Sequence, residues 1–145
     1  YTEREVVARA KISLENYIKT IEVEARTLIE MAKRDIYPAV NGYIAEVCSV
    51  IAAKRAVSEK IVCDADEELA QRLAMLNDGM AAAVKKLEGD LLEIPAGEGA
   101  ASQKMAHVIV PDMEAVRTLS DAMEQLCSAD YWPYPTYTEI MYSVK

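Results

Sequence analysis

This sequence lacks several residue types on which common sites and folds depend. Of its 145 residues none is Phe, one is Trp, one is His, and Gly and Pro number five each. Few turns are therefore encoded, and the abundant Ala, Glu, Leu and Met favour helices over strands. Any Ser–His or Cys–His catalytic pair would have to use His107, and a di-iron bundle, which needs two Glu-x-x-His motifs, is excluded. We expect an all-α protein.

Cysteine and positive charge are also scarce. Cys48, Cys63 and Cys127 are odd in number and show no C-x-x-C spacing, which is typical of reduced thiols in the cytoplasm, and we expect them to be buried and inert. The formal net charge is −8, so we expect neither nucleic acid nor a membrane as a partner. No apolar run reaches membrane-spanning length, and the charged N-terminus has no signal-peptide core.

The first helix is predicted over about residues 2–36. Thr2 and Glu5 fit a capping box at its start. Apolar residues then recur every seven positions and predict one buried face; they are Val7, Leu14, Ile21 and Leu28. Pro38 suits the first turn of a second helix, which should end near residue 58.

Two more helices are predicted in the second half of the chain. Asp64 and Glu67 suggest another capping box. After them comes the clearest amphipathic stripe, which consists of Leu69, Leu73, Leu76, Met80, Val84, Leu87 and Leu91. Residues 94–100, with one Pro and two Gly, predict a loop. The fourth helix begins near residue 102, and its stripe keeps its register across Pro111, as in a kinked helix or two abutting helices.

The last segment, residues 130–145, differs in composition. It contains the single Trp and half of the eight Tyr residues, interleaved with prolines. Because each proline favours an extended residue before it, we expect an extended aromatic tail with one final helical turn through Tyr142, capped by Thr136. Residues 1–145 are thus predicted to form one all-α domain, an up-and-down bundle of about four long helices with this C-terminal tail.

No combination of residues predicts an active site. His107 lies among apolar residues of the fourth helix, and solvated helix faces or helix N-termini explain the acidic clusters, such as the one at residues 64–68. Gly97 and Gly99 follow no strand and are too close together for a phosphate-binding loop. We therefore expect no catalytic residue, no metal ligand and no cofactor-binding residue in this chain.

Three stretches resemble the C-terminal region of type III glutamine synthetases. The first is LENYIKTIEVEA at residues 14–25, and the second is residues 31–43, which contain MAK and IYPAV followed by Tyr43. The third is residues 113–142, which contain WPYPTY at 132–137. Their order and spacing are similar to those of the family over nearly the whole chain.

The resemblance implies a cytoplasmic enzyme that joins ammonia to glutamate with ATP and Mg²⁺ or Mn²⁺ and forms ring-shaped homo-oligomers. None of the family's metal, nucleotide or glutamate motifs can be matched here, so its catalytic core would precede Tyr1, and a start at Tyr rather than Met fits a piece of a longer chain. The segment would then be a structural and assembly domain. Its partners would be the catalytic core of the same chain and neighbouring subunits, with Trp132, Pro133, Pro135 and Tyr137 as packing anchors.

Three other functions stay open at the level of sequence. The Met-lined bundle could be an independent module that binds an amphipathic helix of a partner protein. The domain could also be regulatory and sense a nitrogen metabolite. An enzyme in its own right would need a cleft with perturbed titratable groups, for which the sequence offers no convergent motif.

Overall fold

The computed structural model describes residues 2–135 and 137–142, except for the side chains at positions 137 and 138. Every regular element in these residues is helical, as the composition predicts. The α-helices are α1 (Glu3–Met31), α2 (Tyr37–Val57), α3 (Asp64–Leu92), α4 (Glu98–Lys104), α5 (Val110–Glu124) and α6 (Tyr137–Tyr142), and the π-helical turns are η1 (Ala32–Ile36) and η2 (Met105–Ile109).

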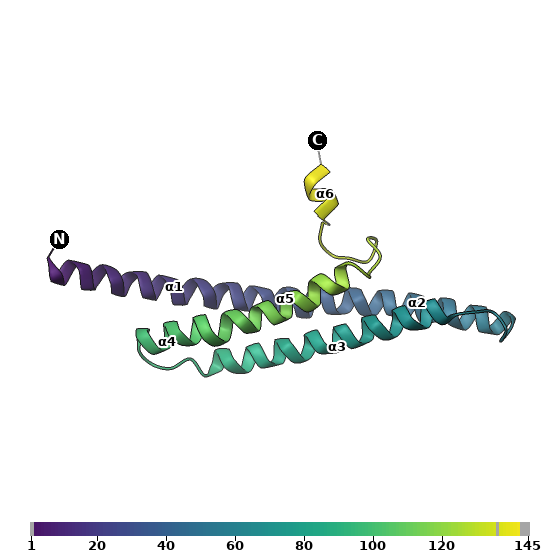
Figure 1. Cartoon of the computed structure of the whole chain (residues 1–145), viewed down its shortest axis with the longest axis horizontal. Helices are drawn as coiled ribbons and strands as arrows, with labels where there is room; N and C mark the ends of the chain where they lie inside the picture. Colours follow the sequence, from purple (N-terminus) through teal and green to yellow (C-terminus); the bar gives the residue numbers. More distant parts are fainter. Residues whose placement is uncertain (1, 136, 143–145) are drawn as a thin grey trace.

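The longest element is a continuous helical rod from Glu3 to Val57, made of α1, η1 and α2 (Figure 1). Pro38 was expected to begin a separate helix, but no loop precedes it. Instead the backbone N–H of Tyr37 donates to the carbonyl of Ala32, five residues back, which closes a π-turn. The wider turn relieves the clash between the proline ring and the preceding turn, so the rod accommodates Pro38.

The same arrangement recurs before the second internal proline. The backbone N–H of Val110 donates to the carbonyl of Met105, so η2 lies directly before Pro111 as η1 does before Pro38. α4, η2 and α5 therefore form one rod, which agrees with the expected continuous or abutting helices across Pro111. The predicted loop before this rod is present at residues 93–97, where Gly97 has φ +98°, a conformation that favours glycine.

Three rods pack side by side around one core (Figure 1). α3 runs back along α2, and the third rod returns along α3, with α4 next to α1 and α5 next to α3. The predicted stripe of α3 faces this core, with Leu69 and Leu76 partly buried. The buried cluster comprises Ala25, Ala32, Ile36, Val40, Leu73, Met80, Val84, Leu87, Leu91, Met105, Ile109, Val116, Met123 and Trp132.

One polar residue, Asn77 of α3, is buried in the interface with α2. Its side chain is 1% exposed, and its Nδ2 donates to the carbonyl of Tyr37 at 3.2 Å and to Oδ1 of Asn41 at 3.1 Å. A buried amide must keep such partners to offset its desolvation. The contact therefore favours one register of α3 along α2, at the turn that carries Pro38.

The start of α1 departs from the sequence expectation in part. The capping box is confirmed in that the backbone N–H of Thr2 donates to Oε2 of Glu5 at 2.8 Å, which lowers the pKa of Glu5. The seven-residue stripe was expected to be buried throughout, but Val7 is 63% and Leu14 is 37% exposed. The neighbouring rods end before they reach this stretch (Figure 1), so only the second half of the stripe meets the core.

The capping box predicted at the start of α3 is not formed. Cys63 occupies the N-cap position and makes no side-chain cap bond, and Asp64 is already the first helical residue. Asp64 and Asp66 instead lie in the first turn, where carboxylates interact favourably with the helix dipole. Lys54 at the end of α2 pairs with Asp66 at 2.5 Å, which ties the two helix ends together.

One helix in the described residues is long and apolar enough to cross a membrane. It is the rod Glu3–Val57, with mean hydropathy 1.3 in its most apolar stretch, of which 17% is buried. This corrects the expectation that no stretch reaches that length. A single such helix is weak evidence for a membrane, because core helices of other proteins pass the same test. The rod also packs against α3 and α4.

Candidate functional site

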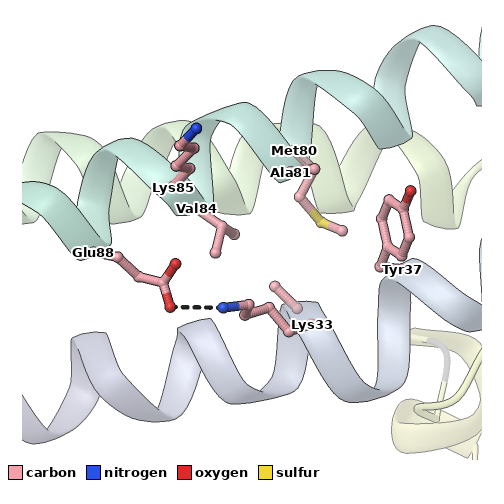
Figure 2. Close-up of a pocket in the computed structure, with 8 residues that line it drawn as sticks. Lys33, Tyr37, Met80, Ala81, Val84, Lys85 and Glu88 are labelled. Carbon is pink, nitrogen blue, oxygen red and sulfur yellow. Dashed lines mark hydrogen bonds and ion pairs between the residues drawn. The ribbon is translucent and has the colours of Figure 1, made fainter.

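A groove of about 450 Å³ lies between the first rod and α3 (Figure 2). Met80 and Val84 point into it from α3, and Tyr37 lies at one end. At the other end Lys33 Nζ and Glu88 Oε1 form an ion pair at 2.8 Å. A neighbouring groove of about 780 Å³ shares this pair and extends along α1 towards Arg26 and Leu92. The side chains of Met80, Val84 and Tyr37 make the first groove suitable for an apolar side chain. Neither groove is lined by a nucleophile next to a base.

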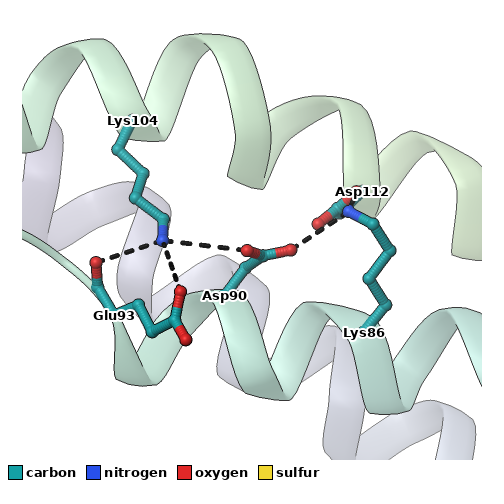
Figure 3. Close-up of polar contacts among 5 residues, drawn as sticks. All are labelled: Lys86, Asp90, Glu93, Lys104 and Asp112. Atoms are coloured by element: carbon teal, nitrogen blue, oxygen red, sulfur yellow. Dashed lines mark hydrogen bonds and ion pairs between the residues drawn. The ribbon is translucent and has the colours of Figure 1, made fainter.

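A polar network joins the C-terminal half of α3 to the third rod (Figure 3). Lys86 Nζ lies 2.6 Å from Asp112 Oδ1 and 3.0 Å from Asp90 Oδ2. These hydrogen bonds raise the pKa of Lys86, and the bond to Asp112 contributes most. The bond from Lys86 is also the main cause that lowers the pKa of Asp90. Lys104 Nζ is 3.7 Å from Asp90 Oδ1 and donates to the carbonyl of Glu93 at 3.1 Å. These ion pairs and hydrogen bonds hold α3 against the third rod.

The single histidine lies on η2. His107 is exposed, and among the described residues it forms no hydrogen bond or ion pair with a carboxylate or thiol, so the residue on which a nucleophilic site would depend has no such partner there. In the part of the chain that the structure describes, no three His, Cys, Asp or Glu side chains come together in a way that could hold a metal ion. The acidic cluster at residues 64–68 instead lies in the first turns of α3 and pairs with Lys54 and Arg55 of α2.

The three cysteines are free thiols in different environments. Cys63 is 2% exposed, and burial raises the pKa of the Cys127 thiol, which makes that thiolate rarer at neutral pH. Cys48 is exposed on α2, contrary to the expectation that all three are buried. The helical spacing of Cys48 places it on the outer side of α2, one position beyond the buried Val47.

The four expected anchor residues of the tail have different surroundings. Trp132 is 8% exposed and belongs to the core of this same chain. Its backbone N–H donates to the carbonyl of Ser128, so the chain turns before the prolines. Pro133 and Pro135 are exposed. Tyr137 begins α6, which confirms the expected final turn through Tyr142, but its side chain and Thr136 lie outside the described residues.

Two tyrosines that were not expected as anchors fasten the tail to the first rod. Tyr134 Oη donates to Asp35 Oδ2 in η1 at 2.5 Å, and burial together with this bond raises the pKa of Tyr134 to about 12. The ring of Tyr131 lies 5.3 Å from that of Tyr43, tilted by 42°, and its hydroxyl reaches Glu46 at 3.4 Å. The only signal in the sequence was the high tyrosine content of the tail.

Two comparisons with known proteins find sequences similar to this chain. Residues 1–55 match the family model described as the glutamine synthetase C-terminal domain. A glutamine synthetase of Butyrivibrio fibrisolvens is 26% identical over 147 aligned residues, and the match covers 100% of this chain and 21% of that protein. The chain thus spans about a fifth of the length of this relative. No solved structure matches the chain significantly.

Proposed function

We propose that this chain is the helical C-terminal domain of a type III glutamine synthetase and serves the assembly of that enzyme rather than its chemistry. The observation that carries the proposal is that the whole chain aligns with only 21% of a glutamine synthetase. On this proposal the residues that bind ATP, Mg²⁺ or Mn²⁺ and glutamate belong to the preceding catalytic part. Ligation of ammonia to glutamate is then the activity of the whole cytoplasmic enzyme in nitrogen metabolism.

The surface of α2 supports a role in assembly. Its most apolar stretch is only 17% buried, and Val50 and Val57 are 39% and 81% exposed. An exposed apolar helix face of this kind marks a contact surface in many proteins. We propose that it faces the catalytic core or a neighbouring subunit of a homo-oligomer, with neither nucleic acid nor a membrane as partner.

The tail, residues 130–145, belongs to the same proposal. Trp132 anchors it inside the bundle, and the exposed Pro133 and Pro135 follow directly. We propose that these prolines, together with Tyr137, form an arm that extends from an up-and-down bundle to a neighbouring part of the assembly. Rigid prolines beside a buried aromatic anchor lose little conformational freedom on binding.

The first experiment is to measure the size of the native protein that carries this segment. An antibody against residues 1–145 should detect, in an extract of the source cell, a band several times heavier than 16.1 kDa. The purified protein should form glutamine from glutamate, ammonia and ATP. A band at the size of the segment itself would overturn the proposal and favour the independent binding module.

The assembly role has its own test in the full-length enzyme. A version that ends before Tyr1, and a Pro133→Ser/Pro135→Ser double variant, should both give smaller particles in mass photometry than the parent. The matched control is Met75→Ser, which removes an apolar side chain that is 76% exposed on α3. Particles of unchanged size for both altered proteins would contradict a role in assembly.

A further inference from the structure

The N-terminal end of the first rod extends beyond the rest of the molecule (Figure 1). We refer to residues 3–14 of α1 as the overhang, because every one of them is exposed. Val6, Val7 and Ile12 are 55%, 63% and 57% exposed. The ion pair between Lys11 and Glu98, at 3.3 Å, marks where α4 meets the rod. The overhang is therefore a helix with no apolar neighbour among the described residues except at its last turn.

One face of the overhang continues the stripe that is buried farther along α1. Val7 and Leu14 lie fourteen and seven positions before Ile21, and Ile21 packs on the core of the bundle. Seven residues are close to two turns of an α-helix, so all three side chains point in nearly the same direction. The stripe thus continues past the end of the bundle as a ready contact surface.

The overhang has little stabilisation beyond its continuity with the rest of α1. The packed part of α1 supplies the helix nucleus, but the overhang itself contains three β-branched residues, which are poorer helix formers. The capping box at Thr2 and Glu5 adds only local support. Contact along the Val7–Leu14 face would provide the missing stabilisation.

We propose that the overhang docks through Val7 and Leu14 against the part of the same polypeptide that precedes it. This inference rests on the proposed function, in which the catalytic part of the enzyme is joined at the overhang. A covalent junction holds that part at a high effective concentration next to this face. The occupant is therefore an apolar surface of that preceding part.

Photo-crosslinking in the full-length enzyme tests the identity of the occupant. A benzophenone amino acid replaces Val7, and a matched enzyme carries it at Ile12, which lies five residues on and so about 140° around the helix. The oligomers are assembled from isotopically light and heavy subunits. Position 7 should give crosslinks within one subunit to the preceding sequence, and position 12 should give far fewer. Crosslinks between subunits only, or equal yields at both positions, would overturn the proposal.

Hydrogen exchange in the same enzyme tests the contact itself. A Val7→Ser/Leu14→Ser variant should exchange the amides of residues 5–14 at least about tenfold faster than the parent, since burial of each apolar side chain is worth about this factor. The Ile12→Ser control should leave the rates unchanged. Unprotected amides of residues 5–14 in the parent enzyme would refute the docking of the overhang and leave the proposed assembly role of the domain intact. If the segment is not part of a larger enzyme, the proposed function is refuted before this inference is tested.

Discussion

At Tyr134 a hydroxyl from the tail meets a carboxylate from η1, and the pair gives a stability that depends on pH. Burial and the bond to Asp35 raise the pKa of Tyr134 to about 12, so the fold favours the neutral phenol. The contribution is complete below the unfolded pKa near 10 and is lost as the pH rises towards 12. Tyr134→Phe should therefore lower the free energy of unfolding by about 1 kcal/mol at pH 8, and this difference should shrink above pH 10.

Urea denaturation of both proteins at pH 8, 10 and 11 measures this effect. Tyr142→Phe is the control, because Tyr142 is 75% exposed and should behave like the parent at each pH. A Tyr134→Phe protein that matches the Tyr142→Phe protein at pH 8 would show that the bond to Asp35 adds no stability.

Sequence reasoning at the residue scale identified the aromatic tail but chose its contacts incompletely. Trp132 was expected to anchor the tail on the catalytic core or a neighbouring subunit, because aromatic burial dominates interface energies; in this chain its side chain is buried in the core of the bundle. Tyr134 could not be preferred over Tyr137, because its partner Asp35 is 99 positions away in sequence. A contact at that separation depends on how the rods pack, which local composition does not encode. Asn77 was not expected for the same reason, since its partners lie on α2.

At the scale of elements, the two π-turns correct the phase of the buried stripes. Buried residues of the first rod fall at 25, 32, 36, 40 and 47, and those of the third rod at 101, 105, 109, 116 and 123. Away from the π-turns, successive buried residues are seven positions apart. Around each π-turn two successive intervals of four positions replace one interval of seven, so the chain there contains one extra residue. A π-turn absorbs one such residue without turning the following helix away from the core. The register expected across Pro111 is kept, because Ile109, Val116 and Met123 follow one another in steps of seven, and the extra residue lies before the proline, between residues 101 and 109.

Single-residue deletions test this account of the π-turns. In a Pro111→Ala background, deletion of the exposed His107 should let η2 tighten into α-helix and keep Val116 and Met123 in the core. Deletion of the exposed Glu114 should instead turn both side chains out of the core, at a cost of at least about 3 kcal/mol. Thermal unfolding followed by circular dichroism should show a large loss only for the second deletion. Equal losses would mean that η2 is not a phase correction.

The helices themselves could be predicted because a wide apolar stripe has an unmistakable period, as in α3. The π-turns could not be predicted from Pro38 and Pro111 alone, because a proline is equally compatible with a helix end. The extra residue in the stripe was a usable signal, but it is recognised only when the buried positions are known. The exposure of Val7 depends on where the neighbouring rods end, and no pattern within α1 contains that information.

At the scale of the whole molecule, the long first rod has two apolar faces. Ala25, Ile36 and Val40 face α3 and the third rod, and α2 presents Val50 and Val57 on its outer side. A membrane could in principle cover the outer side. Lipid around the entire rod would have to displace α3 and α5 and expose their buried side chains, such as Leu73 and Val116, to the surroundings.

We therefore expect the chain to remain in the aqueous fraction when it is floated with lipid vesicles. The free energy of unpacking the core opposes insertion, and the net charge of −8 repels an anionic surface in addition. The two causes can be separated, because vesicles of neutral phosphatidylcholine remove the repulsion and leave the packing. The chain should stay unbound to both kinds of vesicle at 0.15 M and at low salt. Flotation with neutral vesicles would mean that the outer face of α2 is a lipid contact, and the assembly role assigned to that face would then have to be given up.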